Sequence, residues 1–139
     1  MIIAIVDGMG GGIGAQLVER IKRENLQGSN LIALGTNAVA TQRMIEAGAD
    51  RGASGENAIR VSIAIADFIV GPIGIVLANA MMGEISPAIA EAILSARGKK
   101  LLLPLVQSHV VFVGLAQKNL GELIAEAVES LVKASKAGD

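Results

Sequence analysis

The 139-residue chain contains no cysteine, tryptophan or tyrosine, and it has a single histidine. The absence of cysteine excludes disulfides, thiolate catalysis and cysteine metal ligands. With one histidine, a Ser-His-Asp constellation or a histidine-rich metal site is poorly supported, so we expect no metal centre. That histidine, His109, falls in a predicted turn, and we expect it to be incidental rather than catalytic.

Charge is also scarce, with 12 Lys and Arg against 13 Asp and Glu and no basic run beyond Lys99-Lys100. We therefore expect neither nucleic acid nor a membrane surface as a partner. The N-terminus passes directly into apolar residues, so we expect no secretory signal. The longest uncharged run, residues 68–83, is short and interrupted by glycine and proline, which argues against a membrane span. These features predict a cytoplasmic protein.

Apolar residues and glycine are abundant: 52% of the chain is hydrophobic, and there are 17 glycines. This length suits one domain over residues 1–139 with a real core, but not a nucleotide domain plus a separate substrate domain. The aliphatic, alanine-rich composition is typical of helices packed closely over a parallel sheet. The apolar surplus in a small chain predicts a homo-oligomer.

Strand-like and helix-like patterns alternate along the chain, which indicates an α/β fold with a mostly parallel, doubly wound sheet. Residues 110–113 predict one further strand, and the short link at 107–109 predicts that it is antiparallel or at an edge. The other predicted strands cover residues 2–6, 31–34, 68–70 and 101–105, with a very short one within 49–53. The predicted helices cover residues 12–24, 38–47, 54–66, 75–82, 87–97 and 120–132.

A glycine-rich loop joins the first predicted strand to the first predicted helix. A phosphate on the free N–H groups of a first helical turn needs a close backbone approach, which a Cβ atom would prevent. The spacing fits both G-x-x-x-G-x-G, a loop of short-chain dehydrogenases, and G-x-G-x-x-A, and the first fits better because it begins directly after the strand. The loop residues that we expect around the phosphates are Gly8, Gly10, Gly11, Gly12, Ile13 and Gly14.

The loop predicts a nucleotide or dinucleotide ligand, with NAD or NADP as candidates. The alternative is a tight turn with no ligand. No lysine lies between Gly8 and Gln16, so the P-loop of nucleoside triphosphatases is absent. The chain also lacks the tyrosine of the tyrosine-lysine pair that short-chain dehydrogenases use, so that activity does not follow from the loop.

Asp7 has two equal interpretations. Its carboxylate could accept hydrogen bonds from ribose hydroxyls or hold a cation, or it could bond to the amides of its own glycine loop.

Small or polar residues also follow two other predicted strands, and the ends of parallel strands meet at one edge of a sheet. Thr36 and Asn37 are expected near a ribose, although the acid that dinucleotide enzymes place there is missing. Arg43 could meet a 2′-phosphate, but a solvated helix arginine is the simpler interpretation. The opposite wall is expected to comprise Gly71, Pro72, Gly74, Asn79 and Glu84, with Glu84 the candidate acid or base.

Several blocks together resemble a family of small bacterial proteins that is catalogued only as a domain of unknown function, number 3842. These blocks are residues 6–8 and 10–14, 35–38, 52–58, 71–75 and 83–87. The resemblance implies a single Rossmann-like three-layer domain in a cytoplasmic protein and supplies no catalytic residue. If the protein is an enzyme, the loop favours an oxidoreductase. The alternative is a non-catalytic metabolite sensor or a homo-oligomeric assembly module.

Overall fold

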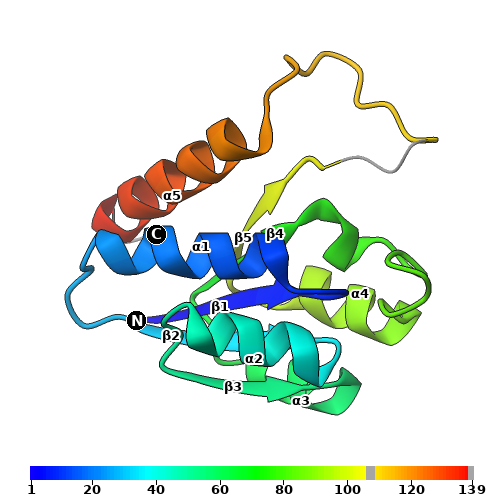
Figure 1. Ribbon diagram of the computed structural model, residues 1–139, viewed down its shortest axis with the longest axis horizontal. Helices are drawn as coiled ribbons and strands as arrows, with labels where there is room; N and C mark the ends of the chain where they lie inside the picture. Colours follow the sequence, from blue (N-terminus) through cyan, green and yellow to red (C-terminus); the bar gives the residue numbers. More distant parts are fainter. Residues whose placement is uncertain (106–108, 138–139) are drawn as a thin grey trace.

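Five parallel strands form one sheet in the order β3-β2-β1-β4-β5 (Figure 1). The computed structural model describes residues 1–105 and 109–137. Every pairing between the described strands is parallel. The strands are β1 (Ile2–Asp7), β2 (Asn30–Gly35), β3 (Arg51–Ser54), β4 (Phe68–Pro72) and β5 (Lys99–Leu103).

Helices cover both faces of the sheet, so the domain has three layers and a Rossmann-like α/β fold. On one face, α1 lies beside both α2 and α5 (Figure 1). The other face carries α3 and α4, which pack on each other, together with a short 3-10 helix. The bounds are α1 (Gly12–Arg23), α2 (Ala38–Glu46), α3 (Glu56–Ile63), η1 (Ile73–Val76), α4 (Pro87–Ser95) and α5 (Leu120–Ala137).

The two cores follow from the alternation of side chains along β1. Ile3 and Ile5 belong to the core under α1, α2 and α5, whereas Ala4 and Val6 belong to the core under α3 and α4. Successive strand residues point to opposite faces, and a strand covered on both sides is therefore apolar at every position. The continuous apolar run of this strand was the sequence signal for a central position.

Two predicted helix starts are confirmed by their capping bonds. The Ser86 hydroxyl accepts a hydrogen bond from the Ile89 amide, with Pro87 at the first helical position of α4. Asn119 and Glu122 form a reciprocal capping box at α5. The helix predicted to start at residue 54 begins at Glu56 instead, because Gly55 precedes α3 and the Ser54 hydroxyl donates to Thr41 rather than capping the helix.

The sixth strand expected at residues 110–113 is a wrong prediction. These residues form no strand, and Val111 and Val113 are 82% and 95% exposed. Strand-forming side chains are not sufficient, because a strand also needs a neighbour to accept its backbone hydrogen bonds. Residues 107–108 of the expected link lie outside the described part of the chain.

The helix expected over residues 75–82 is also shorter than predicted. The 3-10 helix ends at Val76, and turns follow it. Asn79, Met81 and Met82 have positive φ angles, which a right-handed helix does not allow. The chain therefore forms a compact loop after β4 instead of a further helical turn.

The strand order reverses between β1 and β4, since β2 and β3 lie on one side of β1 and β4 and β5 on the other. A crevice forms at such a reversal, outside the carboxyl ends of the strands. The glycine loop after β1 lies at this point. No helix in the described residues combines the length and apolar character needed to cross a membrane.

Candidate functional site

The glycine loop makes a tight connection from β1 to α1. The Gly11 amide donates to the Gly8 carbonyl at 2.9 Å, and Gly11 has a left-handed conformation with φ of 74°. Helix α1 then begins at Gly12. The positive end of the helix dipole therefore faces the crevice at the end of the sheet.

Asp7 is buried at the base of this loop, with 3% of its surface exposed. Its Oδ1 accepts from the Gly8 amide at 2.8 Å, and its Oδ2 accepts from the Gly14 amide at 2.7 Å. Burial raises the pKa of Asp7, while the two amides partly oppose that shift and the nearby Glu84 adds to it. The carboxylate thus ties the two ends of the loop together, as the second interpretation of Asp7 expected.

Three glycines of the loop are required by packing. A Cβ atom on Gly11 would lie 2.7 Å from the Ala40 Cα atom, in addition to the strain of its positive φ. One on Gly14 would lie 2.5 Å from the Met44 Sδ atom. One on Gly8 would meet the side chains of Met81 and Thr36 at 2.7 Å. These positions bring α2 and the loop after β4 close to the loop.

Gly10 and Gly12 differ from those three, because the fold does not require a glycine at either position. Neither has a positive φ, and a Cβ atom on either would meet only the guanidinium of Arg43, at 3.8 Å and 3.4 Å. Within the described part of the chain, no oxygen accepts a hydrogen bond from their amides. The two glycines therefore leave free backbone donors, and only the flexible end of Arg43 lies beside their Cβ positions.

Arg43 places a positive charge beside these donors. It extends from α2, and its Nη1 donates to the Gly10 carbonyl at 3.3 Å. The sequence favoured a solvated helix arginine at this position, because nothing local shows that α2 brings it to the glycine loop. Only the packing of α2 on α1 reveals the contact.

An open cleft of about 440 Å³ lies over the loop. The predicted site residues that line it are Asp7, Gly8, Gly10, Gly11, Gly12, Ile13, Pro72 and Gly74. The sequence did not anticipate the other lining residues, which are Met9, Gln16, Met81, Leu105 and Leu120. Pro72 ends β4 and Gly74 lies in the 3-10 helix that follows, so the cleft occupies the β4 side of the strand reversal.

The remaining predicted residues lie outside this cleft lining. Gly71 is a packing position, since a Cβ atom there would lie 2.4 Å from the Val6 carbonyl oxygen. Asn79 was expected in apolar surroundings, but it is an exposed turn residue with φ of 69°. Asparagine tolerates this conformation better than most residues, which accounts for it without a ligand. His109 is exposed in a turn.

Glu84 gathers Thr36, Asn37 and Met9 around one carboxylate oxygen. Its Oε1 accepts from the Met9 amide at 2.8 Å, from the Asn37 Nδ2 at 2.9 Å and from the Thr36 hydroxyl. The Thr36 hydrogen bond, followed by that of Met9, lowers the pKa of Glu84. A carboxylate held in its charged form suits a hydrogen-bond acceptor better than a general acid near neutral pH.

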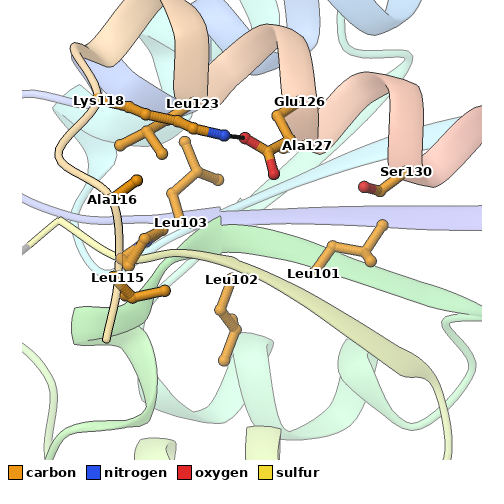
Figure 2. A pocket seen from close by; sticks show the side chains of 11 residues that line it. Leu101, Leu102, Leu103, Leu115, Ala116, Lys118, Leu123, Glu126, Ala127 and Ser130 are labelled. Atoms are coloured by element: carbon orange, nitrogen blue, oxygen red, sulfur yellow. Dashed lines mark hydrogen bonds and ion pairs between the residues drawn. The ribbon is translucent and has the colours of Figure 1, made fainter. Parts of the chain in front are cut away.

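A second hollow of about 220 Å³ lies between β5 and α5, and Figure 2 shows its lining. Leu101, Leu103 and Leu123 contribute apolar side chains, and the ion pair of Lys118 with Glu126 at 2.6 Å lies along one side (Figure 2). Its lining includes none of the glycines of the β1–α1 loop and no arginine. In the described ranges, no group of three or more His, Asp or Glu residues could hold a metal ion.

Comparison with known proteins gives a family and a distant likeness in fold. The family model described as Domain of unknown function (DUF3842) matches residues 2–136. No curated protein matches the sequence. A solved nucleoside-diphosphate-sugar epimerase from Pseudomonas aeruginosa is similar, with 13% identity and a TM-score of 0.47. The match covers 94% of this chain and 45% of that one, and no functional conclusion follows from it.

Proposed function

The chain belongs to the DUF3842 family, and we propose that it binds a nucleotide or dinucleotide through a phosphate on the Gly8–Gly14 loop. One observation carries this proposal: Gly10 and Gly12 line the cleft with free amides, and the packing of the fold does not require a glycine at either position. A loop that only makes a turn needs glycine at Gly8, Gly11 and Gly14, but not at these two positions. A phosphate lying close to the backbone gives both of them a physical reason.

The electrostatic environment of the loop supports an anionic ligand. The dipole of α1 favours negative charge at its N-terminus, and the guanidinium of Arg43 lies within hydrogen-bond distance of the Gly10 carbonyl. Arginine pairs well with phosphate because its planar N–H groups match two oxygens at once. Both oxygens of Asp7 accept hydrogen bonds from the loop amides, which offsets the negative charge that Asp7 places at the cleft.

The rest of the ligand would occupy the cleft between the loop and the end of β4. Pro72, Gly74 and Met81 provide an apolar wall there, and Gln16 adds a polar side chain from α1. NAD and NADP remain the candidate dinucleotides because the loop type is shared with enzymes that use them. A location in the cytoplasm stays a prediction.

Native mass spectrometry tests the proposal with AMP, NAD and NADP added singly to the purified protein. We expect an adduct that is lost in Gly12→Asp, because the new carboxylate would repel a phosphate at the free amides. Gly121→Asp is the matched control, since it introduces the same side chain into the first turn of α5 at an exposed position. Retained binding in Gly12→Asp, or equal loss in both variants, would contradict a phosphate on this loop.

The second candidate function is homo-oligomeric assembly, and one observation favours it. The segment of residues 110–115 places Val111, Val113 and Leu115 in solvent, where they are 82%, 95% and 57% exposed. Exposed apolar groups gathered in one segment are typical of protein interfaces. If this segment holds copies together, Val111→Asp with Val113→Asp should lower the subunit number in the same mass spectra. An unchanged subunit number would assign the assembly to another surface.

A further inference from the structure

The loop after β4, residues 79–85, lies against the glycine loop, where Met81 approaches Gly8 and Glu84 accepts a hydrogen bond from Met9. The base of this loop is closed by the Asn79 amide, which donates to the Ile85 carbonyl at 2.7 Å. Ile85 is fully buried and anchors the loop in the core under α3 and α4. The tip crosses the end of β1, where the Met81 Sδ atom lies 2.7 Å from the position of a Cβ atom on Gly8.

Glu84 then bonds on the far side of β1, to the end of β2. Its Oε1 accepts from Asn37 and Thr36, which follow β2, and from Met9 in the glycine loop. One carboxylate oxygen therefore joins three segments that are distant in the sequence. Dinucleotides bind across the strand reversal, with one nucleotide on each side of the phosphate loop. The side chain of Glu84 lies on the β2 side of that arrangement.

The cleft does not extend to Glu84. Its lining includes residues from the glycine loop and from the end of β4, but neither Thr36, Asn37 nor Glu84. Its volume of about 440 Å³ is near the lower end of the range of about 300 to 1,000 Å³ that is usual for small-molecule sites. The space available thus suits one nucleotide rather than two.

The backbone of the loop is held in an unfavourable conformation. Met81 and Met82 have φ angles of 57° and 58°, in the left-handed region that side chains other than glycine and asparagine rarely adopt. Met9, which donates its amide to Glu84, has a φ of 51°. Such strain persists only where surrounding contacts maintain it, and the three bonds of Glu84 are contacts of this kind.

We infer that the crevice takes a ligand of mononucleotide size, and that Glu84 closes the β2 half that the second nucleotide of a dinucleotide needs. This inference rests on the proposed function, because it divides the same crevice into an open half and a closed half. A dinucleotide of the NAD type then gains nothing from its second nucleotide while Glu84 holds its three donors. Release of Glu84 opens the second half.

The test compares the affinities for AMP and NAD by isothermal titration calorimetry. In the wild type we expect the two dissociation constants to agree within about twofold, since only one nucleotide is bound in either case. Glu84→Ala should make NAD bind about tenfold tighter relative to AMP, because the β2 half opens. Glu84→Gln keeps the shape but not the charge, and should shift the ratio in the same direction by less. Glu91→Ala, an exposed glutamate on α4, is the matched control.

Hydrogen exchange of the Met9 amide provides a readout that needs no ligand. Slow exchange in the wild type and fast exchange in Glu84→Ala are expected if the bond closes the crevice in solution. Fast exchange in both proteins would overturn the inference. The exchange measurement also tests the inference when a variant binds neither compound, because it reports directly whether the Met9 amide is hydrogen-bonded.

The outcomes separate this inference from the proposed function. If AMP binds and the ratio is unchanged in Glu84→Ala, the closed half is refuted and the phosphate loop stands. If the wild type binds NAD at least about tenfold tighter than AMP and Glu84→Ala removes that gain, Glu84 accepts a ribose hydroxyl and the inference is overturned. If neither compound binds to any of the proteins, the proposed function is refuted and the inferred ligand size with it.

Discussion

The clearest test of the glycine loop compares Gly11→Ala with Gly12→Ala. The two positions are neighbours with the same sequence context, yet the structure assigns them opposite roles. At Gly11 an alanine would adopt a left-handed φ of 74° and place its Cβ atom 2.7 Å from the backbone of Ala40. At Gly12 the nearest group is the flexible end of Arg43, at 3.4 Å.

The expected loss of stability follows from these two contacts. A left-handed conformation costs an alanine about 1 to 2 kcal/mol. The overlap with α2 adds about 1 to 3 kcal/mol, because backbone atoms cannot move aside as a side chain can. Gly11→Ala should therefore lose about 2 to 5 kcal/mol in total. Gly12→Ala should stay within about 1 kcal/mol of the wild type, since alanine is the better helix former.

Urea unfolding followed by circular dichroism measures this difference, since a chain without tryptophan or tyrosine offers little fluorescence. With a slope of about 1 to 3 kcal/mol per molar urea, the midpoint of Gly11→Ala should fall by about 0.7 M or more. The midpoint of Gly12→Ala should barely change. If both variants lose the same stability, Gly12 is required by the fold, and the main support for a phosphate at this loop disappears.

Two further predictions concern the pH dependence of stability and a helix cap. The pKa of Glu84 is held below its ordinary value of 4.5, so its contribution is present above that pH and is lost as the pH falls through the folded pKa. The stability gap between wild type and Glu84→Gln should therefore shrink on acidification below about pH 4.5, and a constant gap in urea titrations would show that the charge is irrelevant. The raised pKa of Asp7 has the opposite effect on stability, because its contribution is present below pH 3.8 and is lost as the pH rises through the folded pKa. The comparison of wild type with Glu84→Gln separates the effect of Glu84 from that of Asp7, since both proteins contain Asp7. Ser86→Ala should cost about 1 kcal/mol or more, because it removes both the cap of α4 and the hydrogen bond that the Ser86 hydroxyl donates to Glu56. Ser86→Asn should retain most of the stability, since its amide oxygen caps the helix and its amide nitrogen donates to Glu56. Equal unfolding midpoints for Ser86→Ala and wild type would argue against the cap.

The sequence by itself determined the sheet and the place of the loop. Continuous apolar runs such as residues 2–6 indicate strands buried on both faces, and their alternation with helical patterns leads to a parallel order. The starts of the helices predicted at residues 87 and 120 could be located in the sequence, because capping involves residues only three positions apart. Contacts between residues so close in the chain can be predicted from the sequence alone.

Only the tertiary structure decided which glycines serve packing and which leave donors free. Gly11 and Gly12 are the same residue in the same motif, and they differ only in whether α2 lies against them. The strand expected at residues 110–113 failed for a related reason, because strand propensity does not supply a neighbouring strand. Packing between distant elements overrides local preference in each case.

The tertiary structure also decided which charged side chains lie at the crevice. The sequence lacks an acid after β2, yet Glu84 reaches that position from 48 residues beyond Thr36. Arg43, which the sequence assigned to solvent, reaches the glycine loop 33 residues before it. The turn of the chain after β4 and the packing of α2 bring these side chains together, and neither is encoded in a local pattern. The sequence therefore located the loop, and the fold determined which charges surround it.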